Sequence, residues 1–360
     1  MTAKPIFNVP SGATAKVSII DSTLRISNMK FDYLMGPPVN GFDEMDKLPT
    51  WSFLVESSTG HKVLFDLGVP KDKNVFTPSV RKDIEHYGWD LHVDKDVAEI
   101  LKENGTDPSD ISSVIWSHFH LDHIGDISTF PSSTELVVGP GFKQNFGRGY
   151  PTDPESPVRE SYWENRKLRE ISYDESDLLV LKIGSFRAFD FFGDGSFYLL
   201  DTPGHAVGHL AGLARTTRDP DTFIFMGGDL CHHGGELRPT PHDPVPDAVK
   251  FPLPGALRAH MSVCPGGGDF RKLNVQRGRR EDEPFFDTQV AADMKQALET
   301  IEKTQAADVQ DNVFFIFAHD TSISGVVNLF PKPANDWQAQ SWREKTHWGF
   351  LRDLCPGVIS

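Results

Sequence analysis

The stretch SHFHLDHIGD at residues 117–126 places three histidines and two aspartates directly after the apolar run Val114-Ile115-Trp116. A short apolar run of this kind predicts a buried strand. Imidazole and carboxylate groups are the ligands that first-row divalent metal ions bind in proteins. Because alternate residues of an extended chain project to the same side, we expect His118 and His120 to face one ion.

The turn after this strand would present Asp122 and His123 to a second ion. Two ions need about seven protein ligands between them. The local cluster supplies four, so three more must come from other parts of the chain. Three later apolar runs each end in a polar residue that can bind metal, and these residues are His205, Asp229 and His319. Strands that deliver such side chains from one end predict a single site at one edge of the sheets.

Strand and helix patterns alternate along the chain, which predicts the α/β class. Residues 51–68 predict a hairpin around the turn at 57–60, and residues 94–105 predict a helix that precedes the histidine-bearing strand. A second helix at 288–303 is expected to face the core with Val290, Met294, Leu298 and Ile301.

The whole chain, residues 1–360, is expected to form a single domain. Residues 140–170 and 232–286 are long, irregular insertions rich in Gly and Pro, and we expect them to form the rim of the site's pocket. The aromatic residues in these loops that would contact a flat or apolar ligand are Tyr150, Tyr162, Trp163, Phe251, Phe285 and Phe286.

The formal charge of 36 − 51 = −15 argues against nucleic acid as a partner. The basic run at 271–280 is expected to be a solvated loop beside the acidic residues 281–283. No stretch approaches the roughly 20 apolar residues that a membrane span requires, and the three cysteines form no CxxC pair. These features favour a cytoplasmic protein without a membrane partner. Its oligomeric state stays open, and a homodimer is compatible with the sequence.

The motifs resemble those of the metallo-β-lactamase superfamily. HFHLDH with Gly125 behind it, TPGH at 202–205, GGD at 227–229 and AHD at 318–320 occur in that family's order, and the FDLG at 65–68 resembles its earlier Asp-x-Gly motif. These motifs extend over residues from about 50 to 320. The resemblance implies a four-layered αβ/βα sandwich with loop insertions over the active site.

The resemblance also implies a ligand set. In that family's pattern, one metal is held by His118, His120 and His205, the other by Asp122, His123 and His319, and Asp229 bridges both. Zinc is the metal expected at such a site, although Mn²⁺ or Fe²⁺ suits the same ligands. Asp66 is expected to help order the site, and His209 is expected to be a hydrogen-bonding support or a core residue in preference to a metal ligand. The remaining histidines apart from His232 are expected on the surface or in loops: His61, His86, His92, His233, His242, His260 and His347.

Within the superfamily, the chain looks most like the lactonase branch, and it also resembles fungal lactamase-like members associated with benzoxazolinone-type rings. His120 favours hydrolysis over oxygen reduction, because the di-iron members carry a carboxylate there. Many bacterial lactonases place a tyrosine three residues after the bridging aspartate, where this chain has His232. A histidine can donate to an oxyanion or move a proton, although His232 as a plain loop residue is nearly as well supported.

The expected reaction is therefore hydrolysis of a small cyclic ester or amide. The resemblance implies that a hydroxide bridging two metals attacks the carbonyl carbon, with Asp122, Asp229 and His232 taking part in catalysis. A thioesterase acting on an acyl or glutathione thioester is the alternative, and it would need a cationic groove near the site. A catalytically silent metal-binding module is a third reading, which retention of the whole ligand set disfavours.

Overall fold

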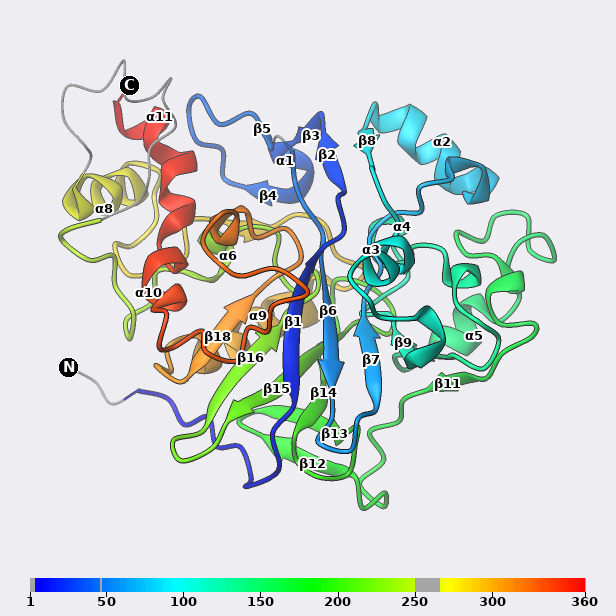
Figure 1. Cartoon of the computed structure of the whole chain (residues 1–360). Helices are drawn as coiled ribbons and strands as arrows, with labels where there is room; N and C mark the ends of the chain where they lie inside the picture. Colours follow the sequence, from blue (N-terminus) through cyan, green and yellow to red (C-terminus); the bar gives the residue numbers. More distant parts are fainter. Residues whose placement is uncertain (1–3, 46, 250–265, 360) are drawn as a thin grey trace.

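Two six-stranded sheets pack face to face in the computed structural model, which describes residues 4–45, 47–249 and 266–359 (Figure 1). The first sheet has the order β1-β6-β7-β9-β10-β11, and its members are β1 (Lys16–Asp21), β6 (Trp51–Glu56), β7 (Lys62–Phe65), β9 (Ile111–Ile115), β10 (Glu135–Val138) and β11 (Leu168–Glu170). Strands β1, β6 and β7 pair antiparallel, and β7, β9, β10 and β11 pair parallel.

The second sheet has the order β12-β13-β14-β15-β16-β18. Its members are β12 (Val180–Ile183), β13 (Phe186–Asp190), β14 (Phe197–Asp201), β15 (Leu210–Thr217), β16 (Thr222–Met226) and β18 (Val313–Ile316). Neighbours from β12 to β16 pair antiparallel, whereas β16 and β18 pair parallel. The parallel pairs matter for the site, because their carboxyl ends meet at one edge of each sheet.

The main hydrophobic core lies between the two sheets. It includes Phe53 and Phe65 from the first sheet and Leu199, Ile224 and Ile316 from the second. Helices cover both outer faces. Over the first sheet lie α3 (Val97–Glu103), α4 (Leu121–Ile124) and α5 (Phe142–Phe146), and over the second lie α6 (Gly234–Leu237) and α9 (Met294–Asp308). The order helix, sheet, sheet, helix confirms the expected αβ/βα sandwich.

A cap lies over the ends of the sheets that carry the histidines, at the top of Figure 1. We use the word cap for residues 24–45 and 76–93, whose apolar side chains form a second core with the C-terminal segment. Its elements are β2 (Arg25–Ser27), β3 (Met29–Lys30), α1 (Phe31–Leu34), β4 (Met35–Gly36), β5 (Glu44–Met45), α2 (Pro78–Tyr87) and β8 (Asp90–His92). The elements packed near it are α8 (Gly267–Gln276), β17 (Asp287–Thr288) and α11 (Cys355–Ile359), whereas α10 (Trp342–Thr346) packs on β18.

Most local predictions are confirmed. The hairpin of β6 and β7 turns at residues 57–60, and α3 begins after a capping box at Asp96. The prediction for the later helix was partly wrong, because Met294 and Leu298 are exposed while Ile301 packs on the sheet. Small and polar residues that the apolar pattern overlooked, such as Ala297 and Thr304, complete the buried face.

The basic run at 271–280 is also not a loop, since α8 continues to Gln276. Its charges are paired as expected: Arg280 contacts Asp282 and Glu283, and Arg279 contacts Asp287. Among the described residues, no helix combines the length and the apolar composition that a bilayer span requires.

Candidate metal centre

Five strand ends bring the site together. Asp66 follows β7 and Ser117 follows β9, while His205, Asp229 and His319 come after β14, β16 and β18. Backbone hydrogen bonds join the two sheets here, since Leu210 N–H donates to the Ser117 carbonyl at 2.9 Å and Trp51 N–H donates to the Ala318 carbonyl at 3.0 Å. The site is therefore fixed by regular structure on both sides.

The local histidine cluster was predicted from the alternation of side chains along a strand, but it does not lie on one. Strand β9 ends at Ile115, and His118 and His120 lie in the bends before α4. The bends nevertheless turn both rings toward the same point, with ring centroids 4.4 Å apart.

The first group of candidate ligands consists of His118, His120, His205 and Asp229, whose ligand atoms lie within 4.8 Å of one another. His120 Nδ1 is 3.0 Å from His205 Nε2, and Asp229 Oδ2 is 3.7 Å from His205 Nε2 and 3.9 Å from His118 Nε2. Ligands about 2.1 Å from a tetrahedral ion are roughly 3.4 Å apart, so the spacing fits one metal ion.

The second group consists of Asp122, His123, Asp229 and His319, within the same limit of 4.8 Å. Asp229 Oδ1 lies 3.2 Å from His123 Nε2, and Asp229 Oδ2 lies 3.3 Å from His319 Nε2. Asp122 Oδ2 is 3.5 Å from His319 Nε2. Asp229 belongs to both groups, so all seven residues named from the sequence come together at one point.

Asp66 and Ser117 orient two of the rings from behind. The Asp66 carboxylate accepts from Ser117 N–H and Ser117 Oγ, both at 2.7 Å, and lies 2.8 Å from His123 Nδ1. Ser117 Oγ, having donated to Asp66, accepts from His118 Nδ1 at 3.0 Å. Both rings therefore carry their proton on Nδ1 and turn the lone pair of Nε2 toward the site, as metal ligands require.

Two further contacts act in the same way. His319 Nδ1 donates to the Pro49 carbonyl at 2.7 Å, which leaves Nε2 for the site. His209 Nδ1 donates to the Thr202 carbonyl at 2.9 Å, and its Nε2 accepts from the backbone N–H of Asp229 at 3.0 Å. Of the two interpretations weighed for His209, hydrogen bonding to a candidate ligand is the one observed.

Gly228 makes this close packing possible. Its φ is +54°, and a Cβ there would lie 2.9 Å from His209 Nε2 and 3.0 Å from Ser117 Cβ. A side chain would therefore push apart the groups that hold Asp229.

The charge balance of the site calls for a cation. Burial lowers the pKa of His118 and His205 well below the ordinary value, so both are neutral at pH 7. Burial opposes protonation of His319, yet the carboxylates of Asp229 and Asp122 raise its pKa to about 9. Burial would also raise the pKa of Asp229, but the positive charge attracted to His123 and His319 holds it well below the usual range. The carboxylates thus draw positive charge into a buried site, and a metal ion supplies it directly.

Unsatisfied polar atoms give an independent test of that fit. Within the described part of the chain, His118 Nε2, His123 Nε2 and Asp229 Oδ1 are buried and have no hydrogen-bond partner. Orphaned buried polar atoms are rare because each costs about 1–3 kcal/mol. All three atoms face the two groups of ligands, so the residues present fit divalent metal ions.

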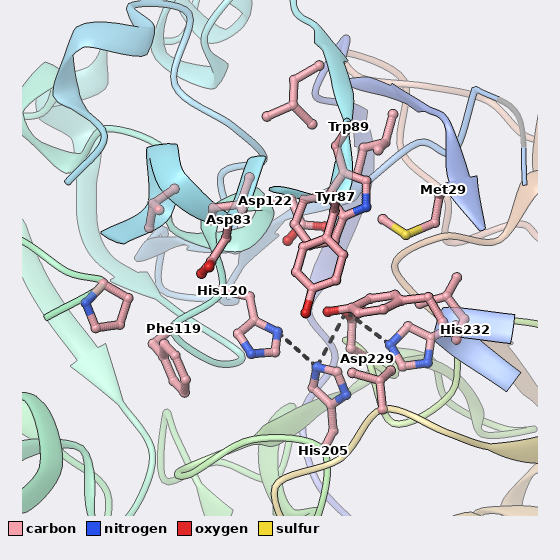
Figure 2. Close-up of a pocket in the computed structure, with 18 of the residues that line it drawn as sticks. Met29, Asp83, Tyr87, Trp89, Phe119, His120, Asp122, His205, Asp229 and His232 are labelled. Atoms are coloured by element: carbon pink, nitrogen blue, oxygen red, sulfur yellow. Dashed lines mark hydrogen bonds and ion pairs between the residues drawn. The ribbon is translucent and has the colours of Figure 1, made fainter. Parts of the chain in front are cut away.

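A cavity of about 400 Å³ opens above this cluster. Its floor includes His120, His205, Asp229 and His232 (Figure 2). The cap forms the opposite wall, where the rings of Tyr87 and Trp89 stack with centroids 4.8 Å apart and planes 13° apart. Tyr33 completes the wall, with its ring centroid 5.5 Å from that of Trp89.

The structure places the predicted pocket aromatics elsewhere. Tyr162 and Trp163 pack with the outer core of the first sheet, and Phe285 and Phe286 are buried beneath the cap. Tyr150 stacks under the Arg159 guanidinium. Phe251 lies outside the described residues, as does His260. The five described aromatics do not line this cavity, because burial against a core is the usual fate of an aromatic in an irregular loop.

The two insertions supply only a small share of the described lining of the cavity. Of the insertion at 140–170, the described residues that line the cavity are Glu155 and Pro157, and of the insertion at 232–286 only His232. The cap supplies most of the other lining residues that the structure describes. A sequence signal for this wall does exist. The two cap segments, which were assigned no structure from the sequence, contain the aromatic residues Tyr33, Tyr87 and Trp89.

Two of the histidines expected on the surface or in loops, His233 and His347, lie in a bend and a turn but are buried. His233 accepts from Gly235 N–H at 3.0 Å and packs against the rings of Phe286 and Phe350. His347 lies 2.5 Å from Asp243 Oδ2. Both have polar partners inside the fold, which the sequence pattern does not reveal. By contrast, His61, His86, His92 and His242 are exposed, as predicted.

Comparison with known proteins agrees with this geometry. Residues 45–218 match the family described as the metallo-beta-lactamase superfamily. Gamma-lactamase FDB1 of Fusarium pseudograminearum (strain CS3096) is 41% identical over 361 residues, which cover 98% of this chain and 85% of that protein. The chain belongs to the metallo-β-lactamase superfamily. It is a metal-dependent hydrolase of that family.

Other relatives extend the comparison. Metallo-hydrolase mfmC of Annulohypoxylon moriforme is 40% identical over 361 residues, covering 98% of this chain and 91% of that one. A solved N-acyl homoserine lactone hydrolase with N-hexanoyl-L-homoserine bound at its catalytic metal centre has a TM-score of 0.55 at 17% identity, covering 89% of this chain and 99% of that one. At that identity the likeness concerns the fold alone.

Proposed function

We propose that this metallo-β-lactamase family member is a dinuclear hydrolase that opens a small, uncharged cyclic ester or amide. The observation that carries the proposal is the pair of ligand groups sharing Asp229 on the floor of a mainly apolar cavity. Relatives named gamma-lactamase and N-acyl homoserine lactonase support a ring substrate. We expect zinc at both positions, although the donor set also suits Mn²⁺ and Fe²⁺.

The charge of the cavity narrows the substrate. Its acidic lining residues are Asp83, Asp122, Glu155 and Asp229, and no lysine or arginine is among the described residues that line it. Bound metal ions would offset Asp122 and Asp229, but Asp83 and Glu155 remain, and no lysine or arginine of the described lining would bind the carboxylate or phosphate groups of glutathione and pantetheine thioesters. The absence of a cationic groove from the described lining therefore favours a ring substrate over the thioesterase alternative.

The cap wall favours a flat substrate. Tyr87 and Trp89 present stacked rings to the cavity, and an aromatic or otherwise planar ring packs well against such a surface. Met29 and Leu34 add apolar area to the same wall.

The mechanism follows from the positions of the candidate groups. Two divalent ions, when bound, would lower the pKa of a water molecule toward 7 and so supply hydroxide without a side-chain base. Asp66, Ser117 and His209 hold the ligand atoms in place, so little reorganisation is needed during the reaction. Attack on the carbonyl carbon would give a tetrahedral intermediate, and His232, on the cavity floor, is placed to reach the leaving oxygen or nitrogen.

A panel assay tests the proposal. We expect the metal-replete protein to release protons from uncharged lactones, cyclic carbamates or lactams, with chelation abolishing turnover. Asp229→Ala should lose at least about 10²-fold in kcat and bind metal weakly, because it removes a ligand from both groups. Turnover limited to glutathione or pantetheine thioesters, or an Asp229→Ala protein with full activity, would contradict it.

A further inference from the structure

A buried carboxylate lies directly behind His232. Glu236 belongs to the first turn of α6, is 1% exposed, and accepts from the backbone N–H of His232 at 2.8 Å through Oε1. The same oxygen is 3.8 Å from His232 Nδ1. On the other side of the ring, His232 Nε2 is 3.6 Å from Asp229 Oδ2, a contact drawn in Figure 2.

Two polar atoms of this pair are unsatisfied. Within the described part of the chain, His232 Nδ1 and Glu236 Oε2 are both buried without a hydrogen-bond partner. Each such atom costs about 1–3 kcal/mol, so a purely structural pair would be expected to satisfy them. A small rotation of the ring closes the gap of 3.8 Å to a hydrogen bond of about 2.8 Å.

The surroundings leave Glu236 as the partner of Nδ1. The rings nearest to His232 are those of His205 and His319, with centroids 4.9 Å and 6.0 Å away. The His319 ring lies almost parallel to that of His232, at 14°, so it offers its face and not its edge. An aligned carboxylate behind a histidine fixes which nitrogen carries the proton and stabilises the doubly protonated ring.

We propose that Glu236 is a positioning residue that holds the Nδ1 proton of His232, so that Nε2 relays a proton to the leaving atom of the substrate. After the hydroxide has attacked, Nε2 accepts the proton that this oxygen still carries in the tetrahedral intermediate. As the bond between the carbonyl carbon and the ring oxygen or nitrogen breaks, its electron pair passes to that heteroatom, which takes the proton from Nε2. The histidine returns to its neutral form, and the ring-opened acid carries all the atoms of substrate and water.

This inference rests on the proposed ring-opening function and makes a distinct prediction. A proton is needed only by a poor leaving group. The test is therefore a pair of uncharged lactones, one releasing a phenol and the other an aliphatic alcohol, assayed with wild-type protein and Glu236→Gln. Glutamine keeps the size of the side chain and can still accept from the His232 backbone.

We expect Glu236→Gln to lower kcat for the alcohol-releasing lactone by about 10²-fold. For the phenol-releasing lactone, kcat should stay within about threefold, with KM for both substrates nearly unchanged. Metal content should equal that of wild type. Glu302→Gln, on the exposed side of α9, is the matched control and should change neither substrate.

A readout without turnover accompanies the assay. In ¹⁵N-histidine spectra, with the His232 signals identified by their loss in His232→Gln, wild-type His232 should carry its proton on Nδ1 and Glu236→Gln should not. Equal losses for both lactones, no loss for either, or the same His232 tautomer in both proteins would overturn the role of Glu236. If wild-type protein opens neither lactone, the proposed function fails, and the spectra alone decide the positioning role.

Discussion

At the scale of single residues, the site depends on carboxylates that never reach the cavity. Asp66 is 1% exposed and contacts Ser117 and His123 through both oxygens. Burial raises the pKa of its carboxyl group, and the contact with His123 and the two hydrogen bonds from Ser117 oppose that rise. Its hydrogen bonds hold the lone pairs of two histidine rings toward the site.

Asp66→Asn should weaken metal binding by about 10- to 100-fold, because an amide orients His123 less firmly and lacks the balancing charge. Asparagine tolerates the positive φ of 62° at this position, so the backbone is retained. Metal affinity, measured by competition with a chelator of known affinity, checks this. Asp190→Asn, at the end of β13, is the control, and equal affinities for wild type and Asp66→Asn would contradict the account.

The seven candidate ligands could be predicted from the sequence because each follows an apolar run, which is a local signal. The supporting contacts differ in this respect. For example, the Pro49 carbonyl accepts from His319, which is 270 positions away in sequence. This contact depends on how the two sheets meet, and no local sequence pattern encodes it. Glu236 escaped notice for the same reason, since a single glutamate in a Gly-rich segment looks like an exposed residue.

At the scale of elements, the cap decides which molecules can reach the metal groups. The segment from α2 to β8 carries Tyr87 and Trp89, whose stacked rings line the cavity. From the sequence, the insertions at 140–170 and 232–286 were expected to form the rim of this pocket. The cap elements are too short for clear periodicity, and their approach to the site is fixed by packing with the distant C-terminal segment.

Trp89→Ala should raise KM for a flat ring substrate by about tenfold while leaving kcat within about twofold, since the ring adds binding area away from the reacting bond. Steady-state kinetics measure both constants. Tyr150→Ala distinguishes the sequence interpretation from the structure, because Tyr150 lies off the cavity and its loss should leave KM unchanged. A larger effect from Tyr150 than from Trp89 would show that the wall has been misassigned.

At the scale of the whole molecule, a buried ion-pair network connects the C-terminal segment to the second sheet's helix layer. The Arg238 guanidinium donates to Asp308 at 2.6 and 2.5 Å and to the His347 carbonyl at 2.5 Å. Arg238→Met should lower the free energy of unfolding by about 3–5 kcal/mol, because it leaves Asp308 buried without its partner. Denaturant titration measures this. Lys30→Met, which breaks an exposed pair with Glu44, should leave stability close to wild type.

The same network predicts that the folded protein loses stability at low pH. Although burial opposes ionisation, Arg238 and His347 lower the pKa of Asp308 to about 2, below its unfolded value of about 3.9. A depressed folded pKa means that the stabilisation is present above about pH 4 and is lost as the pH falls toward 2. Asp308→Asn should flatten the pH dependence of stability in this interval, measured by thermal unfolding. An unchanged slope would contradict the assignment.

The central claim, a hydrolase that needs two metals sharing Asp229, is tested most directly by titrating the metal-free protein with Zn²⁺. Bound metal and turnover of an uncharged lactone or lactam would be recorded at each addition. We predict binding of two ions per chain, with turnover appearing fully only after the second. Full turnover with one ion, or in the metal-free protein, would contradict the claim.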